Sequence, residues 1–166
     1  MEQKDTFRHR RYDTPAYLIW AGARPATGGK GRSAYITMVA DEARKEIARP
    51  IDALDIEVEV LYATRQKVDI RADVDNILWP TLDALKGVAY RDDRQVRSVT
   101  ATIFDLNDNT LVAGRVEYVG RLFYSGRADT VLVCIYSDSR LADLGGEQAV
   151  RDERYRDWDR RRRAGG

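Results

Sequence analysis

The sequence predicts an α+β fold: a single domain in which helices cover one mixed β-sheet. Three patterns in the 166 residues indicate this class. An apolar stripe at helical spacing follows Ser33, apolar and acidic residues alternate from Leu54 to Tyr62, and a continuous apolar run extends from Val131 to Tyr136. The expected order is strand, helix, strand, helix, three strands and a final helix, a mixture typical of an α+β domain.

The N-terminal part is predicted to contain a tail, a strand, a loop and a helix. Residues 1–14 lack apolar periodicity and are expected to be a disordered basic tail, and residues 16–20 form a strand candidate. A Gly-rich loop follows, suited either to contact phosphates or to act as a solvent-exposed connector. Its basic residues are Arg24, Lys30 and Arg32. Ser33 is the expected N-cap of a helix that Pro50 terminates.

The alternating segment 54–62 has the pattern of a half-buried strand. Leu54 is expected to face the core, whereas Glu57 and Glu59 are expected to face water. Residues 96–104 and 111–124 are predicted to pair as a hairpin, and the apolar run 131–136 to be a strand covered on both faces. The domain is expected to span residues 15–145. Residues 146–166 are expected to form a charged helix and a basic tail.

Composition limits the classes of function. The single Cys134 excludes an internal disulfide, and the single His9 lies in a basic tract, which argues against a His-rich zinc site or a Ser-His-Asp triad. No apolar run has membrane-spanning length and no signal-peptide pattern is present, so a reducing, cytoplasmic setting is expected. The formal net charge is +1, so any binding of nucleic acid must depend on local basic patches.

The most informative segment extends from Lys67 to Val96. It holds five carboxylates, at Asp69, Asp73, Asp75, Asp92 and Asp93, around a short amphipathic helix. Pro80 is expected to loosen the first turn of this helix or to mark its start, which leaves Asp73 and Asp75 in extended or turn backbone. If the chain folds back after the helix, Asp93 approaches that pair.

Three carboxylates around one point would suit a hard divalent cation such as Mg²⁺. Each acidic pair also has an ordinary structural explanation. Asp is a preferred N-cap, and Asp-Asp before Arg-Gln is common in solvated turns.

Three spaced motifs carry a family resemblance. Asp73-Val-Asp75-Asn76, then Leu82-Asp83-Ala84-Leu85, and finally Asp92-Asp93 with Gln95-Val96, resemble the signature of the RusA family of Holliday junction resolvases. The resemblance implies a RusA-like nuclease domain that forms a homodimer. It also implies cleavage of branched DNA with the cofactor Mg²⁺, which Mn²⁺ can replace, in recombination and repair.

The resemblance also implies roles for individual residues. The expected catalytic residues are Asp73, Asp75 and Asp93, and the expected metal ligands are these three with Asp92. The expected DNA-binding residues are Arg24, Lys30, Arg32, Lys67, Arg71, Asn76 and Lys86.

One position departs from the family pattern. The family usually has a catalytic lysine four residues after the second Asp of the first motif, where this chain has Trp79. A tryptophan supplies no positive charge to the scissile phosphate. Two alternatives to an active nuclease therefore stay open. One is a junction-binding protein with weakened chemistry, in which the tryptophan stacks on a base or fills the core, and the other is an interaction module with structural acids.

Overall fold

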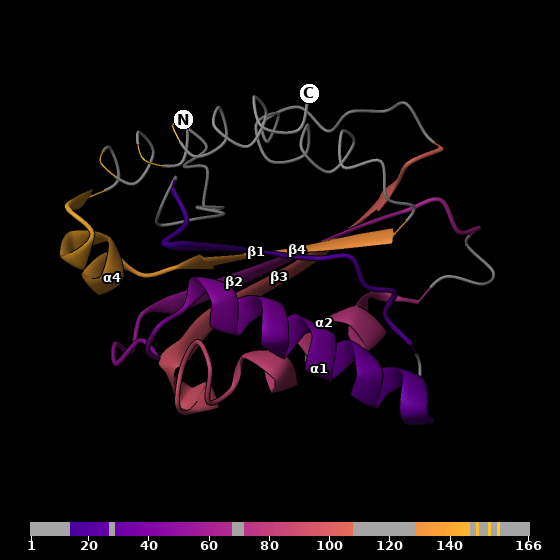
Figure 1. Cartoon of the computed structure of the whole chain (residues 1–166), viewed down its shortest axis with the longest axis horizontal. Helices are drawn as coiled ribbons and strands as arrows, with labels where there is room; N and C mark the ends of the chain where they lie inside the picture. The colour runs from indigo at the N-terminus through magenta and orange to yellow at the C-terminus, as the bar shows by residue number, and fades with distance from the viewer. Residues whose placement is uncertain are drawn as a thin grey trace, which may run out of the picture.

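In a computed structural model, the described residues of the chain fold around a four-stranded mixed sheet in the order β1-β4-β2-β3. The model describes residues 14–26, 29–67, 72–107 and 129–146, together with residues 149, 153 and 156. The strands are β1 (Tyr17–Ala21), β2 (Ile56–Thr64), β3 (Val96–Asp105) and β4 (Asp129–Tyr136). The helices are α1 (Gly29–Glu46), α2 (Val74–Leu85) and α4 (Asp138–Asp143). Figure 1 shows α1 and α2 on the same side of the sheet and α4 beside one end of it. The predicted α+β class with a mixed sheet is confirmed.

The pairing of the strands explains the position of α2. β4 pairs antiparallel with both β1 and β2, whereas β2 and β3 run parallel. Parallel neighbours cannot be joined by a tight hairpin, so the chain must cross over between them, and a helix is the usual means. α2 lies in this crossover. A short 3-10 helix, η1 (Asp93–Gln95), leads from the crossover into β3.

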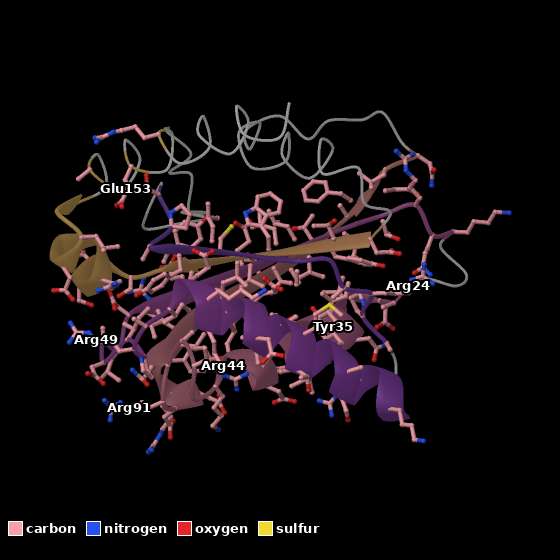
Figure 2. The ribbon with its side chains drawn as sticks, viewed as in Figure 1. Arg24, Tyr35, Arg44, Arg49, Arg91 and Glu153 are labelled. Carbon is pink, nitrogen blue, oxygen red and sulfur yellow. The ribbon has the colours of Figure 1, made fainter. Side chains whose placement is uncertain are left out.

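The core lies between the sheet and α1 with α2. Val39, Ala40 and Ala43 of α1 are buried, as the apolar stripe predicts. Tyr35 is buried as well, and Figure 2 shows its side chain between α1 and the sheet. The helix begins at Gly29 and not at Ser33, because the Gly-rich stretch continues into helical turns. The positions of Lys30 and Arg32 in a flexible loop were therefore predicted wrongly.

β2 is buried along its whole length, which corrects the prediction for its acids. Glu57 and Glu59 are 8% and 2% exposed, because β2 is a central strand between β4 and β3. Each buried carboxylate has a partner, as burial of a charge requires. Arg97 Nη2 donates to Glu57 Oε1 at 2.6 Å, and the Tyr136 hydroxyl donates to Glu59 Oε2 at 3.1 Å. Leu54, which was expected in the core, precedes the strand and is 75% exposed.

The predictions for β4 are confirmed, whereas several others concern residues that the structure does not describe. β4 is fully buried in its central part and Cys134 is inaccessible, as predicted. Outside the described residues lie positions 1–13 of the predicted tail 1–14, the strand 111–124 and most of the charged segment 146–166. Thr14, the last residue of the predicted tail, is described and is buried, which corrects the prediction of disorder there. The short α4, directly after β4, was not predicted. In the part of the chain that the structure describes, no helix is long and apolar enough to cross a membrane.

Gln95 joins the end of the crossover to the segment before β2. Its side-chain Nε2 donates to the carbonyl oxygens of Ile51 and Ala53 at 2.7 and 2.9 Å. Its Oε1 accepts from the backbone N–H groups of Arg91 and Asp92 at 2.8 and 3.0 Å. The side chain is buried, so these four backbone groups have limited access to water.

Replacing Gln95 with Ala should therefore lower the free energy of unfolding by about 3 kcal/mol, because buried backbone donors and acceptors lose their partners. Urea denaturation followed by circular dichroism measures this loss. Arg94→Ala is the matched control, since that neighbouring side chain is 88% exposed and its removal should change stability by less than about 1 kcal/mol. Equal stability of the two variants would contradict the assignment.

Candidate metal and DNA site

Asp73 forms the N-cap of α2. Its backbone is extended, with φ −80° and ψ 175°, and the helix begins at the next residue. The side-chain Oδ1 accepts from Asn76 N at 3.2 Å and from Asn76 Nδ2 at 2.6 Å. Asn76 thereby holds the carboxylate in one orientation. Oδ2 of Asp73 makes no hydrogen bond to the residues that the structure describes.

The helix continues through Pro80, which corrects two predictions. α2 starts six residues before the proline, and Asp75 lies in its first turn rather than in extended backbone. An internal proline removes a backbone donor and disfavours the helical conformation of Trp79 before it. Tertiary contacts offset this cost. Pro80 is buried, and Thr81 Oγ1 donates to Ile77 O at 2.7 Å and lies 2.7 Å from Tyr35 Oη of α1.

Asp73 and Asp75 therefore flank the start of α2, one before the helix and one in its first turn. Asp75 is exposed and has no ion pair with a residue in the described ranges. The N-terminal end of a helix carries partial positive charge, which lowers the repulsion between two such carboxylates. Exposed carboxylate oxygens fit a hard, oxygen-seeking divalent cation.

Asp92 and Asp93 are held by local partners at the end of the crossover. Asp92 caps η1, and hydrogen bonds from the Arg94 side chain and backbone lower the pKa of its carboxyl well below the ordinary 3.8. Asp93 Oδ2 accepts from Lys86 Nζ at 2.6 Å, and this bond raises the pKa of the lysine. Asp93 is exposed to solvent, whereas Asp92 is half-buried.

Lys86 directly follows α2, so the two acidic motifs lie towards opposite ends of the helix. Thirteen residues at about 1.5 Å per residue place Asp73 about 20 Å from Lys86 along the helix axis. Across the ranges that the structure describes, no three His, Cys, Asp or Glu side chains are placed to share a metal ion. The turn after α2 brings Asp93 to Lys86 and does not form a three-carboxylate group with Asp73 and Asp75.

The predicted DNA-binding residues have different surroundings. Arg32 donates to Asp83 Oδ2 at 2.7 Å and links the start of α1 to α2. Lys30 and Lys67 are exposed, whereas Arg71 lies outside the described residues, as does the carboxylate of Asp69. Figure 2 shows Arg24 at the opposite end of the domain from Arg91. Lys86 is bridged to Tyr90, the residue before Arg91, so it lies away from Arg24, and the predicted basic residues do not form one compact patch.

A carboxylate that the sequence analysis missed holds Arg24 in place. Asp129 Oδ2 accepts from Arg24 Nη2 at 2.8 Å and from Nε at 3.1 Å. Its Oδ1 accepts from the hydroxyls of Tyr62 and Thr64, both at 2.7 Å. Partial burial of Asp129 opposes ionisation, but these hydrogen bonds outweigh it and lower the pKa of the carboxyl. Asp129 is separated from Arg24 by 105 residues, so no local sequence signal indicates this network.

Together these features define a class of protein. It is a small α+β domain in which exposed carboxylates flank the start of a crossover helix between parallel strands. The family model described as Endodeoxyribonuclease RusA matches residues 26–117, more than half of the chain and the whole crossover, and the protein belongs to this family. Membership implies an endodeoxyribonuclease that resolves branched DNA. A search among curated proteins found no match to the chain.

Protonation of Asp129 should destabilise the fold in acid. The unfolded chain binds this proton near pH 3.8 and the folded chain only at lower pH. The stabilisation is therefore fully present above pH 3.8 and disappears as the pH falls through the lowered pKa. Asp129→Asn should lower the free energy of unfolding at pH 7 by about 1–3 kcal/mol. It should also make stability less dependent on pH below the ordinary pKa of 3.8.

Chemical denaturation across this pH range measures both effects. Asp41→Asn serves as control, because Asp41 forms only an exposed pair with Arg44 one turn along α1. If the Asp129 and Asp41 variants have the same dependence on pH, Asp129 is not the group that links stability to acid.

Proposed function

We propose that the protein is a Mg²⁺-dependent endodeoxyribonuclease that cleaves Holliday junctions and related branched DNA by phosphodiester hydrolysis. The observation that supports this proposal is the exposed pair Asp73 and Asp75 at the start of α2, inside the segment that matches the family. Core packing explains neither side chain. Capping explains Asp73 but not the additional charge of Asp75.

In this proposal Oδ2 of Asp73 and the carboxylate of Asp75 hold the cation, Mg²⁺ or Mn²⁺. Two carboxylates are sufficient for Mg²⁺, which commonly takes its other ligands from substrate phosphates and water. When bound, the ion supplies an activated water and neutralises charge on the phosphate. The residues of the chain orient the reaction. Asn76 fixes the rotamer of Asp73, and the N-terminal end of α2 presents partial positive charge to the phosphate.

We further propose that the third acid, Asp93, enters the site through homodimer formation. In one chain Asp93 is bound to Lys86 beyond the other end of α2. A two-fold axis repeats each contact in reverse, so Asp93 of the partner subunit can join Asp73 and Asp75, with Asp92 beside it. A four-way junction needs two symmetric cuts, which two symmetric sites provide.

Branched DNA would then be recognised through its phosphates and its shape. Lys30 and Arg32 lie in the first turns of α1 and carry positive charge at a helix N-terminus. Arg24, Lys67 and Lys86 add exposed cations elsewhere, and Arg71 completes the proposed set. Phosphate contacts position DNA without reading its sequence, so we expect preference for DNA structure rather than for sequence.

A second candidate function rests on Trp79. The structure contains no lysine at this helical position, and the tryptophan side chain is exposed beside Asp75. A protein of this family without that charge could bind junctions tightly and cut them slowly. This alternative keeps the same fold and the same DNA, and differs only in the chemical step.

Asp73→Asn and Asp75→Asn should each lower the rate of nicking of a labelled four-way junction by about 100-fold or more, because charge stabilisation by the bound ion is lost. EDTA should abolish nicking by the natural protein, and Mg²⁺ or Mn²⁺ should restore it. Asp41→Asn, an exposed acid on α1, is the control and should nick at the normal rate.

Gel electrophoresis of the cleaved strands, together with a binding assay in EDTA, separates the candidate functions. Tight binding without nicking by the natural protein would favour the weakened form, and Trp79→Lys should then raise nicking. Nicking that persists in both Asn variants would contradict the proposed metal site.

Mixing two inactive variants tests the shared site. A chain with Asp73→Asn and Asp75→Asn is combined with a chain carrying Asp93→Asn, after unfolding and refolding together. In a mixed dimer with shared sites, one of the two sites keeps all three acids, so nicking of one strand should return. If each chain forms its own complete site, every site in the mixture lacks an acid and no activity should return.

A further inference from the structure

Trp79 is exposed although the core of the domain needs large apolar side chains. α2 turns Ile77, Pro80, Ala84 and Leu85 towards the interior, whereas 57% of Trp79 is accessible to solvent. The tryptophan therefore does not fill the core, which was one of its two expected roles in a junction-binding protein. The indole offers a flat aromatic surface on the outer side of α2.

The neighbours of Trp79 on the helix surface are charged. Asp75 lies four residues before it and Asp83 four residues after it, so both are adjacent to the indole on one stripe of α2. Asp83 is paired with Arg32 of α1 at 2.7 Å. On one side of the indole there is thus a neutralised ion pair, and on the other a carboxylate with no ion pair to the described residues.

We propose that Trp79 is a binding site for an unpaired DNA base next to the phosphate that is cut. This inference rests on the proposed function, because it takes Asp75 as a ligand of the cation on that phosphate. A nucleotide whose phosphate lies at Asp75 has its base within reach of a side chain one helical turn away. Stacking on an aromatic ring accepts any base, and the centre of a branched DNA is where bases lose their neighbours.

The charges favour DNA over a second copy of the chain as the occupant of this surface. The centre of a protein interface is poor in Asp, since a buried carboxylate without a partner is costly. In the proposed dimer the partner subunit reaches Asp75 only through its Asp93, a ligand of the same cation, whereas a protein surface that also covered the indole would keep the phosphate away from that cation. DNA brings a phosphate and its cation to Asp75, while Asp83 retains Arg32.

The effect of stacking is measured on the intact protein, with a four-way junction that carries 2-aminopurine at its centre and with EDTA present to prevent cutting. Trp79→Ala should weaken junction binding about tenfold and leave binding to linear duplex unchanged, whereas Trp79→Phe should keep most of the affinity. Trp79→Leu, which is apolar but cannot stack as a ring, should behave like the Ala variant. Leu54→Ala removes another exposed apolar side chain and is the matched control.

Fluorescence gives the direct readout. In a background of Trp20→Phe and Trp158→Phe, Trp79 is the only tryptophan, and its emission should be quenched by the junction but not by duplex. Junction binding with no quenching, or full affinity of the Leu variant, would overturn the inference while leaving the nuclease in place. Quenching without nicking in Mg²⁺ would support the stacking site and overturn the nuclease. Dissociation of the dimer in Trp79→Ala would assign the surface to a second copy instead.

Discussion

The parallel pairing of β2 with β3 is the constraint on which the candidate site depends. Two parallel neighbours force the chain to return across the sheet before the second strand begins. The return segment carries α2 and both acidic motifs, and it occupies the centre of the region that matches the family. The motifs that carry the resemblance thus belong to one crossover, towards the two ends of its helix, and the remaining strands support it.

The polar residues of this crossover stabilise the structure as well as supporting the proposed chemistry. The Gln95 side chain forms four hydrogen bonds with backbone groups and so joins the end of the crossover to the segment before β2. Asp92 caps η1 and Asp73 caps α2. The residues of this family motif therefore contribute to folding as well as to the proposed function. A substitution at one of them can change both, so its effect on stability must be measured separately from its effect on activity.

Local patterns were sufficient for most of the elements. Periodicity predicted the buried face of α1, the strand β3 and the doubly covered strand β4, because each pattern is repeated over several residues. The acids of β2 were placed in water because alternation was read as half burial. Both faces of β2 are covered, and the sequence of one strand does not show what packs on its second face.

The sequence predicted residues for the candidate site but not their arrangement. Asp73, Asp75 and Asp93 were named from the spacing of the motifs and stay predictions, whereas the pairing of Asp93 with Lys86 depends on how the chain leaves α2. Pro80 suggested a broken first turn, and burial against α1 overcame that local preference. The contact between Asp129 and Arg24 joins opposite parts of the chain, and such pairs have no local signature.

Asp73 caps α2 and, in the proposed site, also binds the ion, and these two roles restrict which amino acids can replace it. Ser, Thr or Asn would still begin the helix but would bring no negative charge, and Glu would keep the charge on a side chain that is a weaker N-cap. Among these residues only aspartate has a short side chain that can accept the N-cap hydrogen bond and also carry a negative charge. Among relatives with the same crossover, a neutral residue at this position would mark a chain that keeps the fold and lacks the proposed ion ligand.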